Sequence, residues 1–393
     1  MAGGQRRWSF TQREIHDQHR IRRGAGMNRP LAESRRNQIL AQLRRGGALR
    51  VTELAALLDA APVTIRRDIR WLADQGIIRR VHGGAMIDTA DPPSQAEAGP
   101  SGGAGSSLQI GMLVPSLDYY WPGVIQGAQA EAQERGIQLH LRGSSYDSTD
   151  DRAQITHLRD SGADGLLMAP DIASPAALET LAWLRAEQVP VVLVERELMP
   201  PQDHTPFESV TTDHRGGART GVRYLAELGH RRIGLVVGLS PHADEVRRGW
   251  VAALAEGGLD QGVPDRELAQ PGSVEALPVI DSIIDESLAG EVTALLIHAD
   301  REAIAVAQRC QRRGIKIPDH LSIVSYDDEI VSVFSPPMTA VRPPRTSIGR
   351  AAVSLLGQRL RDPSRPAHRI QLSPKLSIRA SAGPPPQGQA ETS

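Results

Sequence analysis

The chain has 393 residues, enough for two or three domains, and its 40% of hydrophobic residues can fill a substantial core. Its one cysteine, Cys310, excludes an intrachain disulfide and fits a reducing cytoplasm, and no apolar run approaches the roughly 20 residues of a membrane span. The formal net charge of −1 hides an asymmetry: residues 1–87 hold 17 Arg against 7 acidic residues, a net of +10, which leaves −11 for the remainder. A basic head on an acidic body indicates a nucleic-acid partner for the head.

Residues 1–29 are charged and lack the apolar stretch of a secretory signal, so we expect a disordered N-terminal extension. Met27 stands just before the first predicted helix, so the sequence leaves open whether translation starts at Met1 or at Met27.

Three short helices and a wing, formed by a strand and a tight turn, are predicted between residues 30 and 87. Apolar residues recur at helical spacing within 39–43, 51–58 and 65–72, and Pro62 suits the first position of the third helix. The apolar run 77–81 followed by His-Gly-Gly-Ala predicts a strand and a tight turn.

The third helix presents a cationic face opposite its apolar one. Arginine there can bond a phosphate or the O6 and N7 atoms of guanine, and threonine can contact a phosphate or a thymine methyl group. Solvated arginines without a ligand are the alternative, but the order of helices, turn and wing favours DNA. The candidate DNA-binding residues are Thr64, Arg66, Arg67, Arg70, Arg80 and His82.

The segment TIRRDI at 64–69 and the segment RRVHGGA at 79–85 resemble the winged helix-turn-helix domain of the DeoR family. The resemblance covers about residues 30–87 and implies binding to double-stranded operator DNA. Ala61 departs from it, because the family usually places a capping Ser there, and a lost cap costs about 1 kcal/mol.

A Pro, Gly, Ser and Ala stretch at 88–107 predicts a flexible linker, and a similar composition predicts a disordered tail at 382–393. Between them, short apolar runs alternate with amphipathic helical stretches from LQIGMLV at 108–114 to LSIVSY at 321–326. This pattern predicts β-α-β units and parallel, doubly wound sheets, and the length favours two lobes with a ligand cleft at the carboxyl ends of the strands. The predicted fold class is therefore α/β with a small helical head.

The runs GADGLLMAP at 162–170 and LGHRRIGLVVG at 228–238 resemble the effector domain of the LacI/GalR regulators, which is similar to periplasmic binding proteins. The resemblance spans 108–381 and implies a two-lobed domain that binds a sugar-like effector and forms dimers. It places the first lobe at about 108–212 plus a helix near 345–362, with three crossings between the lobes.

Sugar hydroxyls are matched by carboxylates and arginines, and sugar C–H faces by aromatic rings. The aromatic run after the first strand, the strand-end Glu-Arg pair and Asp327 occupy the positions that the resemblance assigns to effector contacts. Core packing of one or two of the aromatics is the alternative. The candidate effector-binding residues are Tyr119, Tyr120, Trp121, Glu195, Arg196, Arg247, Asp300 and Asp327.

Three positions depart from the LacI/GalR pattern. Glu195 replaces the usual Asp, Ala299 replaces the Asn before Asp300, and Val246 stands where the family commonly has a ligand-binding arginine. Arg247 is expected to take over that contact, the alternative being that it is solvated. The effector therefore cannot be named from the resemblance.

The sequence predicts a cytoplasmic, effector-controlled DNA-binding transcription regulator, a homodimer that represses carbohydrate-use genes. An enzyme is the first alternative, but no phosphate loop, nucleophile elbow or HExxH or CxxC spacing supports it, and we expect no cofactor, metal or membrane partner. A transport-binding protein, the second alternative, would need an export signal. Control through the flexible linker leaves two routes open: altered dimer geometry, or docking of the basic head on the acidic body.

Overall fold

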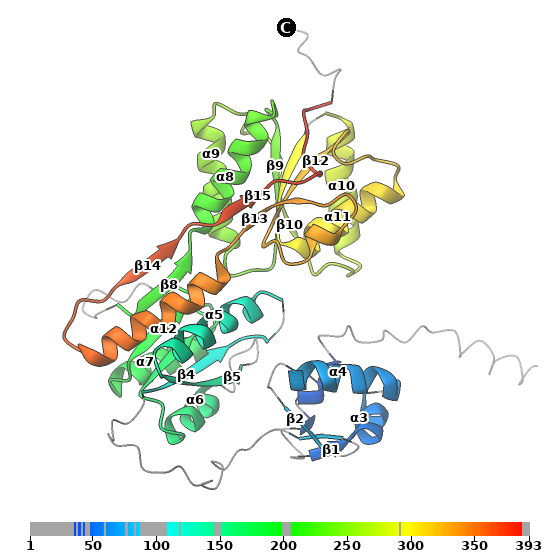
Figure 1. Cartoon of the computed structure of the whole chain (residues 1–393). Helices are drawn as coiled ribbons and strands as arrows, with labels where there is room; N and C mark the ends of the chain where they lie inside the picture. Colours follow the sequence, from blue (N-terminus) through cyan, green and yellow to red (C-terminus); the bar gives the residue numbers. More distant parts are fainter. Residues whose placement is uncertain are drawn as a thin grey trace, which may run out of the picture. The chain divides into compact units, whose positions relative to one another are not determined.

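The computed structural model divides into two compact units, Met1–Gly103 and Ala104–Ser393 (Figure 1). The predicted N-terminal extension, the linker, His82 and the last residues of the tail lie outside the described part of the chain. The structure describes residues 35–36, 38–40, 42–43, 48–58, 60–74, 78–81, 84–86, 108–117, 119–144, 151–198, 206–290 and 292–386.

The first unit contains helical residues within 35–43, then β1 (Ala48–Arg50), α3 (Val51–Leu57), α4 (Pro62–Asp74), β2 (Arg79–Val81) and β3 (Gly84–Met86). The three strands form an antiparallel sheet in the order β1-β3-β2, and β1 is an element that the sequence pattern missed. The side chains of the predicted apolar stripes meet in one core. The fully buried members are Ile39, Leu43, Leu54, Ile65 and Leu72.

The second unit has two lobes, each built on one six-stranded sheet. The first sheet has the order β14-β8-β7-β6-β4-β5, with every neighbouring pair parallel. Its strands are β4 (Gln109–Val114), β5 (Gln138–Gly143), β6 (Gly165–Met168), β7 (Val191–Val194), β8 (Glu208–Thr212) and β14 (Arg369–Leu372).

Helices cover both faces of this sheet because successive strand side chains point to opposite sides. α5 (Trp121–Glu134) and α12 (Arg345–Arg361) share a core with Met112 and Val192, whereas α6 (Asp151–Asp160) and α7 (Pro175–Ala186) pack on the alternate residues Leu113 and Leu193. α5 and α12 approach closely at Gly127 and Gly349, where a Cβ atom would lie 2.0 Å from Thr346 O and 1.9 Å from Val124 O.

The second lobe repeats this plan with the strand order β10-β9-β11-β12-β13-β15, parallel except for β13 with β15. Helices α8 (His214–Glu227) and α9 (Ala243–Glu256) cover one face, and α10 (Ala276–Leu288) and α11 (Asp300–Arg312) the other. The strands are β9 (Ile233–Gly238), β10 (Asp265–Leu268), β11 (Ala294–His298), β12 (Ser322–Tyr326), β13 (Thr339–Arg342) and β15 (Lys375–Ser377).

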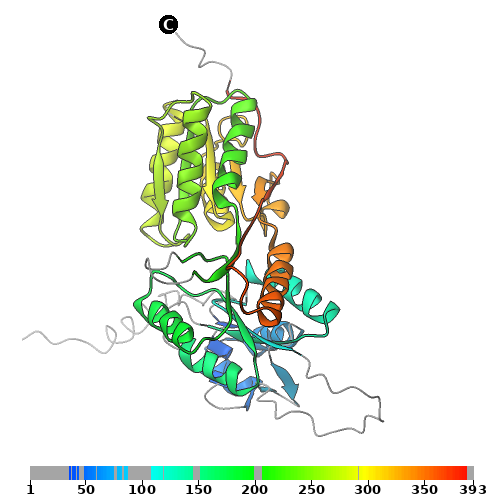
Figure 2. The ribbon, with the colours of Figure 1, turned by 90° about the vertical axis from the view of Figure 1, so that its left-hand side faces the viewer.

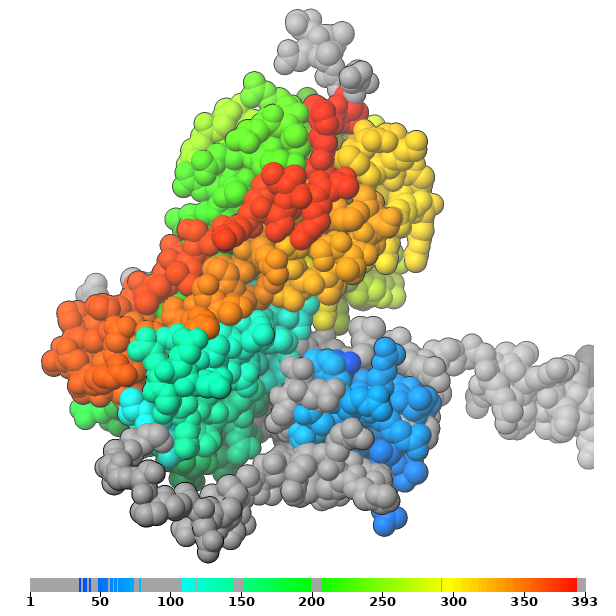
Figure 3. All heavy atoms as spheres, viewed as in Figure 1, coloured from blue at the N-terminus to red at the C-terminus, as the bar shows by residue number. Residues whose placement is uncertain are grey.

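The chain passes between the lobes after β8, after β13 and between β14 and β15, as the sequence predicted (Figures 1 and 2). β14 departs from the prediction. It pairs with β8 in the first lobe, whereas the sequence placed this segment in the second lobe. Figure 3 shows this C-terminal segment on one face of the unit, in orange to red.

The packed structure extends further toward the C-terminus than predicted, since the disordered tail was expected to begin at residue 382. Gly383 accepts a hydrogen bond from His230 Nε2 at 2.8 Å and donates one to Ser322 Oγ at 3.0 Å, so the packed structure continues past residue 381. Among the described residues, no helix combines the length and apolar character needed to cross a membrane.

Candidate functional site

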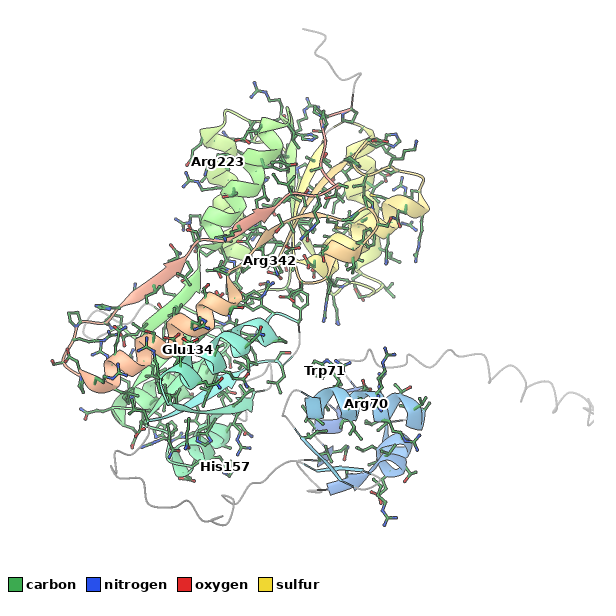
Figure 4. All side chains as sticks on the ribbon, viewed as in Figure 1. Arg70, Trp71, Glu134, His157, Arg223 and Arg342 are labelled. Carbon is green, nitrogen blue, oxygen red and sulfur yellow. The ribbon has the colours of Figure 1, made fainter. Side chains whose placement is uncertain are left out.

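The face of α4 that carries the candidate DNA contacts is exposed. Arg66, Arg67 and Arg70 have exposed side chains, and Thr64 is half-buried. Ile65 and Ile69 lie on the opposite, buried face. Arg70 lies on this helix in Figure 4, next to Trp71. Three guanidinium groups on one side of a short helix match the donor pattern that phosphates and guanine edges accept.

Asp68, in the middle of the TIRRDI segment, has a different role. Its carboxylate is 2% exposed and accepts hydrogen bonds from Arg35 Nε at 2.6 Å and Arg36 Nε at 3.1 Å. The Arg36 guanidinium also lies over the Trp71 ring, 4.1 Å from its centroid. These contacts fix α4 against the first helical residues, so the exposed arginines project from a braced helix.

The predicted wing is described only in part. Arg80 belongs to β2, which pairs with β3 and places Arg80 opposite Ala85, but its side chain is outside the described part. The role of Arg80 and His82 in DNA contact therefore stays a prediction.

The second candidate site lies at the carboxyl ends of parallel strands. Tyr119 and Tyr120 come after β4, Glu195 follows β7 directly, and Asp327 follows β12 directly. Ends of this kind are where ligands bind in doubly wound folds. Tyr119, Tyr120 and Glu195 lie at strand ends of the first lobe and Asp327 at a strand end of the second, and their role in effector binding stays a prediction.

A hydrogen bond joins the lobes at this edge. The Tyr119 hydroxyl donates to Asp327 Oδ2 at 3.1 Å, and it accepts from the backbone N–H of Asp300 at 3.3 Å. Arg345, at the start of α12, donates to the backbone oxygen of Asp327 at 2.6 Å and pairs with Glu329 at 2.5 Å. First-lobe and second-lobe groups therefore meet around one buried carboxyl.

Asp300 is buried, and both oxygens of its carboxylate accept hydrogen bonds from groups of its own lobe. It accepts from Ser325 Oγ at 2.7 Å and from the backbone N–H groups of Asp328, Glu329 and Ile330 at 2.7 to 3.2 Å. These bonds shape the loop after β12. Asp300 therefore acts in this structure as a positioning residue for the Asp327 loop.

Glu195 lies at the centre of a second, fully buried network. Its carboxylate accepts from the Tyr120 hydroxyl at 2.5 Å, from Thr212 Oγ1 at 2.7 Å and from the Thr212 backbone N–H at 2.9 Å. Its Oε2 also lies 3.4 Å from His214 Nε2. The acceptor positions of Glu195 are therefore filled by two hydroxyl groups and one backbone N–H of the chain itself.

Histidines that sequence reasoning missed surround the Glu-Arg pair. The His214 and His242 rings stack, with their centroids 4.0 Å apart, and the His298 and Tyr326 rings meet edge-on at 5.2 Å. Arg196 donates to the backbone oxygens of Pro170 at 2.9 Å and Glu195 at 2.7 Å. Its NH1 lies 3.4 Å from His242 Nε2, which links the first lobe to the second.

Burial dominates the ionisation of these groups. It raises the pKa of Asp327 to about 8, with the negative charge of Asp300 adding to the effect. Burial lowers the pKa of His242 well below its ordinary value and that of His298 to about 3. Burial alone would raise the pKa of Glu195, but His214, Tyr120 and Thr212 together hold it below its ordinary value.

Backbone strain gathers at the same edge. Tyr119, Glu195, Asp327 and Asp328 have φ angles of 59°, 54°, 96° and 57°, and among described residues Gln188 is the one other non-glycine with a positive φ. Such conformations are unfavourable and persist where surrounding contacts enforce them, often at ligand sites.

Comparison with known proteins assigns both units. A DeoR-like helix-turn-helix domain model matches residues 35–91, and a periplasmic binding protein-like domain model matches residues 222–382. The HTH-type transcriptional regulator DegA of Bacillus subtilis is 26% identical over 283 residues, which cover 70% of this chain and 81% of DegA. The HTH-type transcriptional repressor PurR of Aliivibrio salmonicida is 27% identical over 278 residues, which cover 69% and 80% of the two chains. The chain is a DNA-binding transcription regulator.

A solved structure supports the fold of the regulator's second unit. The LacI family transcriptional regulator from Enterococcus faecium, with bound ribose, superposes with a TM-score of 0.57 at 21% identity, covering 70% of this chain and 99% of that one. At this identity the likeness shows the fold.

Two predicted effector residues of the regulator lie away from the cluster. Trp121 opens α5 with its ring 6% exposed in the first-lobe core, so the alternative of core packing holds for it. Arg247, on α9, bonds Asp265 at 2.6 Å and Asp244 at 3.3 Å. The structure does not bring Arg247 to the strand-end cluster, since acidic neighbours on its own lobe hold it.

Proposed function

We propose that this regulator binds operator DNA through the exposed arginines of α4 and that a small, hydroxyl-rich molecule, a sugar or sugar derivative, controls this binding from the strand-end cluster. The observation that carries the proposal is that Tyr119 bonds Asp327, and Tyr120 bonds Glu195, at the strand ends of a two-lobed unit in a chain with a helix-turn-helix head.

The cluster offers what a sugar requires. The carboxylate of Glu195 and the carboxyl group of Asp327 accept from hydroxyl groups, Arg196 donates, and the rings of Tyr119 and Tyr120 provide flat faces for C–H groups. The tyrosine hydroxyls now occupy the carboxylate acceptors, so a ligand that replaces them alters the bonds between the lobes. The ribose bound by the Enterococcus faecium regulator agrees with this chemistry.

We propose that the regulator acts as a cytoplasmic repressor and homodimer. PurR is named a repressor, and two small heads on one operator gain affinity when they are linked, because the second binds at high effective concentration. Neither role requires catalysis, and the similar proteins named above are regulators, which supports a non-enzymatic function.

A thermal-shift screen of the full chain against sugars and related metabolites tests the effector proposal. A ligand that binds the folded state raises the melting temperature by mass action. The shift should disappear in Asp327→Ala and remain in Arg247→Ala, whose side chain lies away from the cluster. A ligand that stabilises both variants equally would place the effector elsewhere.

A further inference from the structure

An exposed valine lies at the start of the helix that carries the candidate DNA contacts. Val63 is the second residue of α4, and its side chain is 70% exposed. Among the described residues of the first unit, Leu57 on α3 is the other large apolar side chain that is exposed. Single exposed apolar residues are common on protein surfaces, so exposure alone assigns Val63 no role. The assignment depends on its neighbours along α4.

Val63 lies on one ridge of α4 with the three exposed arginines. An α-helix turns by about 100° per residue, so positions 63, 66, 67 and 70 fall within about 100° of one another around the axis. The side chains of Arg66, Arg67 and Arg70 are exposed, and Figure 4 labels Arg70, two turns beyond Val63. Ile65, on the opposite side of the helix, is fully buried. Val63 is therefore flanked by guanidinium groups on the face opposite the core.

The chemistry of valine restricts what this position can contact on DNA. Phosphates and most groups on the base edges are charged or form hydrogen bonds, and a valine packed against them would remove their water without replacing it. The C5-methyl group of thymine is the apolar feature of the major groove. Arginines that bond phosphate or guanine hold the ridge against the groove. A valine between them is complementary to a thymine methyl group.

We propose that Val63 reads the C5-methyl group of one thymine in the operator and so contributes to the sequence specificity of the head. This assignment rests on the proposed function, because it requires that α4 enters the major groove of operator DNA. The N-terminal residues of a recognition helix contact base edges, and Val63 belongs to the first turn of α4. Thr64, which the sequence pattern offers for a thymine methyl group, is half-buried and lies about 100° from Val63 around the helix.

The test replaces thymine by deoxyuridine, which keeps the base pair and removes the C5-methyl group. An operator is selected from random DNA with the full chain, and its thymines are replaced one at a time. For the original chain, one replacement should weaken binding about 4-fold, the affinity equivalent of one buried methyl group. Val63→Ala should lose a similar factor on the thymine operator and bind the thymine and deoxyuridine operators equally. Val63→Ile, which keeps a branched apolar side chain, should retain the difference.

A purely structural role of Val63 would weaken binding to both operators alike, so the ratio of the two affinities separates the two roles. Alanine has a higher helix propensity than valine, and position 63 is exposed, so Val63→Ala should fold as the original chain does. Val251→Ala, at an exposed valine on α9 of the second unit, is the matched control and should keep the original ratio.

The proposal would be overturned by a thymine-to-deoxyuridine ratio that is unchanged in Val63→Ala. It would also be overturned by a ratio that disappears in Thr64→Ser instead, or by an operator that tolerates every replacement. In these three outcomes the operator is still bound, so the proposed function stands. Failure of the original chain to select any DNA would refute the proposed function and this assignment together.

Discussion

Replacing Asp327 by Asn should remove a pH-dependent loss of stability that the buried Asp327 carboxyl causes. The folded-state pKa of Asp327 is about 8, whereas an exposed Asp in the unfolded chain titrates near about 3.9. A raised folded-state pKa means that the native state holds the proton longer than the unfolded state. The contribution of this group to stability is therefore complete below about pH 4 and is lost as the pH rises through 8.

The size of the effect follows from the width of that window. Each pH unit between the two pKa values removes about 1.4 kcal/mol of stability, so about 4 kcal/mol is lost between pH 5 and pH 8. Asn cannot ionise, and its side-chain oxygen can still accept from the Tyr119 hydroxyl, which bonds Asp327 Oδ2 at 3.1 Å. The variant should lack this loss.

Urea unfolding of both proteins, recorded from pH 5 to pH 9, provides the assay. The free energy of unfolding of Asp327→Asn should rise relative to the original chain as the pH increases, and the difference should level off above pH 8. Asp319→Asn, an exposed carboxyl in the same lobe, should follow the original chain. Parallel curves for Asp327→Asn and the original chain would refute the raised pKa.

Three further outcomes are expected. Arg66→Ala and Arg67→Ala should each weaken operator binding by about 1 to 3 kcal/mol in footprinting and leave effector-induced thermal shifts intact; full protection by both would place the recognition surface elsewhere. Asp68→Ala should lower the melting temperature of the head, because Arg35 and Arg36 lose a buried partner; an unchanged melting temperature would deny this bracing role. Fragment 108–393, which keeps the packed Gly383, should sediment as a dimer at micromolar concentration, and a strict monomer would contradict dimerisation through this unit. If the basic head docks on the acidic body, the effector response should weaken as salt rises; a response independent of salt would favour dimer geometry.

The sequence predicts the fold of both units because periodicity reports which side chains are buried. The helical spacing of Ile65 and Ile69 predicts α4 and its buried face, and it leaves Arg66 and Arg67 exposed to solvent. The inward direction of Asp68 was not predictable from the same pattern. Its partners lie 32 and 33 residues away, and only the packing of the helices brings them together.

Site residues that directly follow a strand could be predicted from the sequence. Residues whose direction depends on the rotation of a helix, or on contacts within a lobe, could not. Glu195 and Asp327 each follow a strand directly, so their positions at the carboxyl ends of the first-lobe and second-lobe sheets follow from parallel strand order. Trp121 begins a helix whose phase turns its ring into the core, and Arg247 is captured by Asp265 on the neighbouring strand. His214 sits next to a predicted strand end, which was the one signal available for the missed histidines.

The most direct test of the account measures operator affinity with and without effector. An operator is selected from random DNA with the full chain, and its dissociation constant is then measured in the presence of the ligand that the thermal-shift screen identifies. The account predicts a change of at least about 5-fold, a common scale for coupling between sites, and its loss in Asp327→Ala with ligand-free affinity retained. An operator affinity that is the same with and without a ligand bound at the cleft would contradict it.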